Sequence, residues 1–196
     1  MYMIAETKLL KLYNEDKNSV RQISYLLNIS ENTVYYWMDK YGIKRRSISD
    51  AIYLIHNPDG NPFKFRTDLS SDELFLKGVG LGLYWGEGNK ANKYSVRLGN
   101  TNPELLKTFV KFLKVIYCIN PSRLHYGLQI FTDIDVNEAL NYWAKQMNAN
   151  ENQFYKPTIT ISGSMGNYTK KSEYGVLTVY YHNKKLRDII VGQLPK

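Results

Sequence analysis

Residues 78–88 read GVGLGLYWGEG, and they decide how the longer, C-terminal part of the chain is built. An apolar run after Ser71, a residue suited to N-capping, predicts a helix through this stretch. Each glycine inside a helix costs roughly 1 kcal/mol relative to Ala, so these glycines need a compensating reason. Gly78, Gly82 and Gly86 recur at every fourth residue and therefore line one helix face. We expect this face to pack tightly against another helix, because a face without side chains lets a second backbone approach closely.

From Gly80 to Gly88 the sequence resembles the helix motif of the LAGLIDADG homing endonuclease family. In that family two such helices pack face to face on a two-fold axis, and the acid before the last Gly binds a divalent metal. The resemblance implies a dimer interface at Gly78, Gly82 and Gly86, and a metal-binding, catalytic carboxylate at Glu87. Two residues depart from the family pattern. Glu87 replaces the commoner Asp, and Trp85 replaces a residue that is often acidic, which leaves one carboxylate per motif.

The residues after this motif predict an α+β domain in which a mixed or antiparallel sheet packs on helices. Alternation of apolar and polar residues predicts strands at 93–99, 123–132, 158–162 and 176–182. A cap within Asn100 to Asn102 and a capping-box pattern at Asp135 and Glu138 predict two helices, and a last helix is expected to start near Asn183. Each strand has one apolar face, and we expect its residues to be buried; among them are Tyr94, Val96, Leu98, Ile159 and Ile161.

The polar faces of these strands can form one surface. It would carry Lys93, Arg97, Arg123, His125, Gln129, Thr158, Thr160, Thr178 and His182. Hydrogen-bonding side chains at every second position suit a sheet that lies in a DNA groove. A half-solvated antiparallel sheet shows the same alternation without any nucleic acid. Because the chain also has a glycine-faced helix and a basic net charge, we favour DNA contact over a plain half-solvated sheet. Lys170 and Lys171, in the polar loop 163–174, either reach phosphates or belong to a plain exposed loop.

The N-terminal part contains the sequence SVRQISYLLNISENTVYYWMDKYGI, residues 19–43. Ser19 and Ser30 are suited to begin two helices, Asn28 tolerates the left-handed turn between them, and Gly42 ends the second. From Ile23 to Trp37 the spacing resembles the helix-turn-helix family, with Asn28 where that family usually has Gly. The resemblance implies a recognition helix over 31–40 that binds DNA through Asn32, Tyr35, Tyr36 and Lys40, followed by backbone contacts from Lys44, Arg45 and Arg46. The alternatives are a three-helix unit that binds no DNA and, for the basic triplet, a solvated linker.

Three parts follow from these patterns: a small all-α helix-turn-helix domain at 1–46, a connector at 47–70, and a LAGLIDADG-like domain at 71–196. The connector contains NPDGNP, residues 57–62, which is a strong turn signal. The 196 residues carry a net charge of +8, most of it after residue 70, which favours a polyanionic partner such as double-stranded DNA. Cys118 is the only cysteine, so no intramolecular disulfide forms, and we expect it in the core. Neither a signal peptide nor a membrane-spanning apolar run is evident, so we expect a cytoplasmic protein without a membrane partner.

Three functions are compatible with the sequence. The first is a metal-dependent DNA endonuclease; one Glu87 per chain cannot hold Mg²⁺ alone, so the active form would be a homodimer on a near-palindromic site. The second is a non-cleaving transcriptional regulator with a degenerate LAGLIDADG domain, which the Trp85 departure favours. The third, protein–protein interaction only, leaves the helix-turn-helix unexplained. The sequence contains neither a phosphate-cradling loop nor a nucleophile elbow, so nothing in it indicates a small-molecule substrate.

Overall fold

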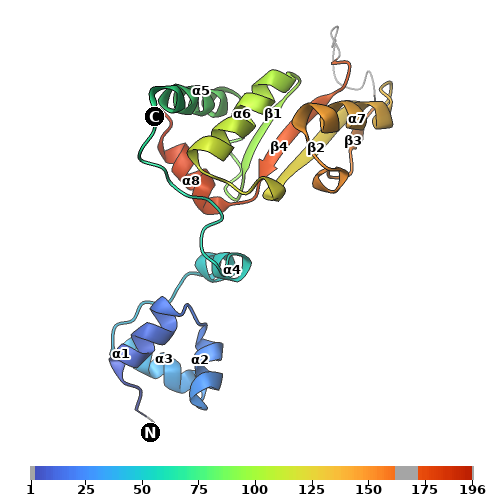
Figure 1. Cartoon of the computed structure of the whole chain (residues 1–196). Coiled ribbons are helices and arrows are strands. Elements are labelled where there is room, and N and C mark those ends of the chain that lie inside the picture. Colours follow the sequence, from blue (N-terminus) through green and yellow to red (C-terminus); the bar gives the residue numbers. More distant parts are fainter. Residues whose placement is uncertain (1–2, 162–171, 196) are drawn as a thin grey trace. The chain divides into compact units, whose positions relative to one another are not determined.

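The computed structural model describes residues 3–161 and 172–195, which form an α+β molecule of two compact units, Met1–Asn61 and Pro62–Lys196 (Figure 1). The boundary falls inside the NPDGNP turn sequence. Each unit has its own apolar core, and the described residues contain eight α-helices and one four-stranded sheet. Among these residues, no helix is both long and apolar enough to cross a lipid bilayer.

The N-terminal unit is all-helical. Its elements are α1 (Glu6–Leu10), which continues as a π-helical turn (Lys11–Glu15), α2 (Val20–Leu27), α3 (Glu31–Lys40) and α4 (Ile48–His56). Apolar residues from α1 to Ile43 form one core: Ile4, Leu9, Tyr13, Ile23, Val34, Trp37, Met38 and Ile43. Helix α4 contributes no buried residue to this core.

The turn between α2 and α3 has the geometry that the sequence predicts. The side chain of Ser19 accepts a hydrogen bond from the backbone N–H of Gln22, and Gln22 closes a capping box. Asn28 adopts the left-handed conformation (φ 52°, ψ 49°), and Ser30 caps α3. Gly42 has φ 65°, which ends α3 because this conformation strains residues with a Cβ. The predicted helix ends in this unit are therefore confirmed.

The C-terminal unit contains the sheet and four of the helices. In chain order its elements are α5 (Ser71–Glu87), β1 (Val96–Asn100), α6 (Pro103–Ile116), β2 (Leu124–Phe131), α7 (Val136–Met147), β3 (Thr158–Thr160), β4 (Val176–Tyr181) and α8 (Lys184–Gly192), with short 3₁₀ turns at Pro121–Arg123 and Glu151–Gln153.

The sheet is mixed, with strand order β1-β4-β2-β3. Strand β4 pairs antiparallel with both β1 and β2, and the short edge strand β3 pairs parallel with β2. Alternate residues of β1, β2 and β4 are buried against residues of α5, α6, α7 and α8 in one core. Figure 1 shows α6 and α7 lying across the sheet. The predicted α+β class and mixed sheet are confirmed.

Several local predictions are wrong. The N-cap of α5 is Ser70, not Ser71, because Ser70 and Glu73 form a capping box. Strand β1 starts at Val96, since the side chain of Asn92 accepts hydrogen bonds from the backbone of Tyr94 and Ser95 and holds a turn there. As a result Tyr94 is 71% exposed and Ser95 is buried, the reverse of the expected alternation.

Three further residues expected in the core are exposed. Ile159 and Ile161 lie in and just after the edge strand β3, which has a partner on one side only, and they are 52% and 69% exposed. Cys118 follows α6 in a left-handed conformation (φ 44°) and is also exposed.

Candidate nucleic-acid interface

Helix α3 has one buried and one exposed face. Val34, Trp37 and Met38 are buried, whereas Asn32 and Lys40 are exposed and Tyr36 is 45% exposed. The Nζ atom of Lys40 lies 4.6 Å from the centre of the Trp37 ring and 6.0 Å from that of Tyr36. Lys40 is therefore held against an aromatic surface while its ammonium group stays in solvent.

Tyr35, at the edge of the exposed face of α3, is half-buried. The guanidinium of Arg45 lies 5.3 Å from its ring and 3.9 Å from a carboxylate oxygen of Asp39. Lys44, beside it in the chain, is exposed. Lys44 and Arg45 thus add two accessible cations next to the end of α3.

Arg46 behaves differently from its two neighbours. Its guanidinium donates hydrogen bonds to the backbone carbonyls of Tyr13, Lys17 (3.1 Å) and Asn18 (3.3 Å), at the end of the first helix. Its backbone N–H donates to the hydroxyl of Tyr13 at 2.8 Å, and the guanidinium lies 4.0 Å from the Tyr13 ring. These contacts stabilise the N-terminal unit. They engage the guanidinium that was expected to contact the DNA backbone, so we leave Arg46 out of the candidate interface.

The sheet has a polar face opposite the helices. Cross-strand pairing places Arg97, Tyr180 and His125 in one row across β1, β4 and β2, and Gly99, Thr178 and Gly127 in the next. Gln129 pairs with Thr158 of the edge strand, and Thr160 follows two residues later. All these residues remain partly or fully exposed. The structure thus brings together Arg97, His125, Gln129, Thr158, Thr160 and Thr178, as predicted.

Other predicted members of this surface lie elsewhere. Lys93 is in the turn before β1, and Arg123 is in the 3₁₀ turn before β2; both are exposed but off the strand face. Lys170 and Lys171 lie outside the described residues.

Two tyrosines that are not among the predicted site residues, Tyr155 and Tyr180, also lie on the polar face. The ring of Tyr155 stacks on His125 (5.3 Å between centroids), and its hydroxyl lies 2.6 Å from Nε2 of His182. Tyr180 stacks on His182 at 6.0 Å and lies beneath the guanidinium of Arg97 at 5.2 Å. Burial, together with the nearby His125 and Arg97, lowers the pKa of His182 below its ordinary value of 6.5. No sequence signal identified Tyr155, because it follows a 3₁₀ turn rather than a strand.

Glu87 is the last residue of α5 and is exposed. Gly88 is required next to it, because a Cβ there would lie 2.7 Å from Cε2 of Tyr84 and closer still to the backbone oxygen of Tyr84. The Nζ atom of Lys90 donates to the carbonyl of Trp85 at 2.6 Å and so satisfies a carbonyl of the last turn of α5. The backbone N–H of Asn89 donates to the carbonyl of Arg97, which joins the loop to β1.

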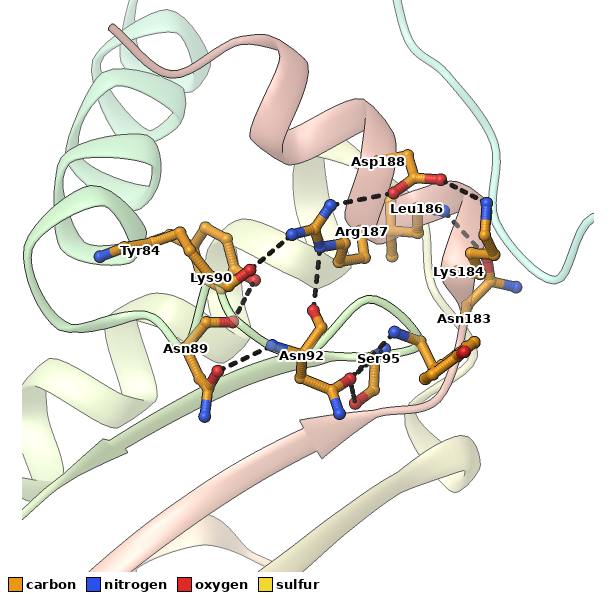
Figure 2. A network of polar contacts seen from close by, with 11 residues as sticks. Tyr84, Asn89, Lys90, Asn92, Ser95, Asn183, Lys184, Leu186, Arg187 and Asp188 are labelled. Atoms are coloured by element: carbon orange, nitrogen blue, oxygen red, sulfur yellow. Dashed lines mark hydrogen bonds and ion pairs between the residues drawn. The ribbon is translucent and has the colours of Figure 1, made fainter. Parts of the chain in front are cut away.

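Figure 2 shows how the C-terminal helix fixes the same loop. Arg187 of α8, whose side chain is 13% exposed, donates to the carbonyls of Lys90 (2.6 Å) and Asn92 (3.1 Å). Asp188 accepts from Arg187 at 3.1 Å and from Lys184 at 2.9 Å. The position of the loop that follows Glu87 therefore depends on α8.

Within the described residues of the C-terminal unit, the glycine face of α5 is uncovered. A Cβ added at Gly78, Gly82 or Gly86 would meet nothing within 4 Å. The glycine that packs on another helix of the same chain is Gly80, where a Cβ would lie 2.6 Å from Cβ of Phe112 and closer still to its ring. The expected close approach between helices thus occurs within the chain through Gly80 and not through the predicted face. Large apolar side chains border the open glycines, with Leu74 56%, Phe75 75% and Trp85 55% exposed.

No group of three or more His, Cys, Asp or Glu side chains placed to hold a metal ion occurs among residues 3–161 and 172–195. No protein-family model matches the sequence, and no curated protein or solved structure is significantly similar to it.

Proposed function

We propose that this chain binds double-stranded DNA through a helix-turn-helix formed by α2 and α3. The observation that carries the proposal is the division of α3 into a buried face and a face that exposes Asn32, Tyr36 and Lys40. A helix exposed in this way can enter the major groove, where Asn32 can pair with an adenine edge. Lys40, Lys44 and Arg45 are suited to phosphate contacts, which position the helix without reading sequence.

The test is DNA affinity, measured on a duplex selected from a random library. We expect Asn32→Ala to cost about 1–3 kcal/mol and to relax the preference at one base pair. Arg45→Ala should weaken binding on every sequence and reduce the salt slope by about 1. Lys8→Ala is the matched control, because it removes an exposed positive charge on α1, outside the two helices of the proposed helix-turn-helix. If neither Asn32→Ala nor Arg45→Ala changes the affinity, this assignment of the interface is wrong.

For the C-terminal unit we propose a LAGLIDADG-like domain that contacts DNA with the polar face of its sheet and pairs with a second copy through α5. The open face of Gly78, Gly82 and Gly86, bordered by exposed apolar side chains, supports pairing, since such a patch is stabilised when it is covered. Residues 62–196 carry 18 Lys and Arg against 11 Asp and Glu, which suits contact with a polyanion. Gly82→Leu fits the single chain and should block the pairing, which analytical ultracentrifugation with and without DNA measures.

Cleavage by this domain requires a divalent metal, and one chain alone does not provide its ligands. Mg²⁺ is usually bound by one or two carboxylates together with phosphate oxygens and waters. Two Glu87 side chains, one from each of two paired α5 helices, would supply two carboxylates at the DNA. Bound there, Mg²⁺ would supply an activated water and would stabilise charge on the leaving oxygen. The role of the chain is to hold Glu87 in place, which Gly88, Lys90 and Arg187 do through the loop contacts described above.

The non-cleaving regulator is the second candidate, and Trp85 favours it. Its exposed indole stands where the resembled motif often has a second acid, so the carboxylate count at the end of α5 is halved. Incubation of a plasmid carrying the selected site with Mg²⁺ separates the two functions. Cleavage that is lost in Glu87→Gln and kept in the exposed control Glu151→Gln supports the nuclease. Tight, salt-sensitive binding without nicking in Mg²⁺ or Mn²⁺ supports the regulator.

A further inference from the structure

Two histidines, two tyrosines and one arginine from separate segments meet on the polar face of the sheet. They are Arg97 of β1, His125 of β2, Tyr155, Tyr180 of β4 and His182, which follows β4. The two imidazole rings lie 5.8 Å apart, and Tyr155 contacts both. Arg97 and His125 flank Tyr180 in the same cross-strand row. We name these five residues the sheet cluster.

The sheet cluster has donors that nothing in the described chain uses. Nε of Arg97 donates to the hydroxyl of Ser95 at 2.7 Å, and its two terminal amino groups have no hydrogen-bond partner among the described residues. Within the same residues, no carboxylate pairs with Arg97, His125 or His182. One fixed positive charge and two groups that can become positive therefore face solvent without an anion.

The hydrogen bonds show which atoms take up protons. The carbonyl of Arg123 only accepts, so Nδ1 of His125, at 3.2 Å from it, carries a hydrogen and Nε2 is the acceptor atom of the neutral ring. Neutral His182 accepts at Nε2 from the hydroxyl of Tyr155. Once His182 is protonated, Nε2 donates to the Tyr155 oxygen, and the hydroxyl hydrogen is released for another acceptor. Protonation thus creates new donors from His125, His182 and Tyr155 at one place.

Without an anion the protonated state of this group is unfavourable, because Arg97, His125 and His182 repel one another when charged. Among the described residues, the titratable and charged groups that face His182 are Arg97, His125, Tyr155 and Tyr180, and none of them is a carboxylate. A phosphodiester in contact with the sheet would reverse this balance, since it supplies one negative charge and oxygen acceptors.

We infer that the sheet cluster binds one backbone phosphate of DNA and takes up protons as it does so. The inference rests on the proposed contact between the sheet and DNA, and it adds that this contact strengthens as pH falls. For each proton taken up, affinity for DNA rises by at most about tenfold for each unit by which pH falls. This rise is confined to the pH range between the pKa of the bound protein and that of the free protein.

The experiment measures affinity of the full chain for a duplex of about two helical turns, at constant ionic strength, between about pH 8 and about pH 5.5. We expect wild-type affinity to increase at least tenfold, or about 1.4 kcal/mol, over this range. The double variant His125→Gln/His182→Gln should lack the increase, whatever its affinity at the alkaline end, and a circular dichroism spectrum equal to that of the wild type shows that it is folded. His56→Gln, the third histidine, is the control that keeps the increase.

A second measurement follows the histidine ring signals by NMR with DNA and with inorganic phosphate as probes. The inference predicts that DNA raises the pKa of His182, which is lowered in the free chain. A rise with inorganic phosphate and none with DNA would show a site for a free anion and overturn the DNA contact. Equal pH dependence in wild type and double variant, or none in the wild type, overturns the inference alone. No DNA binding at any pH overturns both this inference and the proposed function.

Discussion

Alanine substitutions at Gly80 and Gly82 of α5 should change stability in opposite directions, because the two glycines differ in what surrounds them. At Gly80 a new Cβ would lie 2.6 Å from Cβ of Phe112 and closer to the ring, whereas relaxed carbon–carbon contacts are about 3.5–4.0 Å. At Gly82 a new Cβ would meet nothing within 4 Å. Both substitutions gain helix propensity, worth about 0.5–1 kcal/mol.

Phe112 cannot easily give way at the first site. It is fully buried, and its ring contacts the rings of Phe109 and Tyr117 at 5.8 Å and 5.3 Å between centroids. Overpacking of this kind costs about 1–3 kcal/mol, occasionally more. We take about 3 kcal/mol, because the clash is with a fixed ring; after the propensity gain, Gly80→Ala should destabilise the C-terminal unit by about 2 kcal/mol. Gly82→Ala should stabilise it by about 0.5–1 kcal/mol.

The assay is urea unfolding followed by tryptophan fluorescence in a Trp37→Phe background. Trp143 is then the buried reporter, since Trp85 is exposed and Trp37 belongs to the other unit. The unfolding curves are compared at two low protein concentrations, so that association through α5 does not contribute to the free energy of unfolding. Equal shifts for Gly80→Ala and Gly82→Ala would refute the assignment of Gly80 as the residue that packs α5 on α6.

Three smaller predictions concern stability. Arg46→Ala should cost the N-terminal unit about 2 kcal/mol, because it removes charged hydrogen bonds to backbone carbonyls; Arg45→Ala should leave the melting temperature of that unit unchanged. Asn28→Ala should cost about 1 kcal/mol, since Ala is strained in the left-handed conformation, and Asn28→Gly should not; chemical unfolding measures both. The backbone of Ser70 and the guanidinium of Arg66 lower the pKa of Glu73 below 4.5. Ionised Glu73 therefore stabilises the fold above that pH, and this stabilisation is lost as pH falls through the folded-state pKa. Glu73→Gln should remove this acid dependence of the free energy of unfolding.

Local signals in the sequence predicted the parts of the fold that depend on neighbouring residues. Caps at Ser19, Ser30, Asn102 and Asp135 act on backbone groups two or three residues away, and the structure contains all four. Helix α4 was missed, although Ser47 accepts from the backbone of Asp50 in the same way. The sequence predicts a connector at 47–70 instead, because the apolar residues of this stretch show no core pattern.

Longer-range features could not be predicted in this way. The four-residue spacing of the glycines predicts that they share one face of α5. It does not predict which face of α5 packs on α6, because that depends on the position of Phe112. Arg97, His125 and Thr178 were placed on one polar surface, yet nothing local shows that β4 lies between β1 and β2 and so makes Tyr180 the common neighbour of Arg97 and His125. Tyr155 joins them only because its backbone N–H donates to the carbonyl of Tyr126.

The strand order has a consequence for synthesis of the chain. Strand β4, residues 176–181, is the shared partner of β1 and β2, so a nascent polypeptide that has left the ribosome only as far as β3 holds two strands without the one that joins them. The first unit can fold during that interval, since its core is complete at Ile43. Stalling translation before codon 176 should therefore leave a folded amino-terminal domain attached to an unassembled sheet, whose apolar strands need protection from aggregation until β4 emerges.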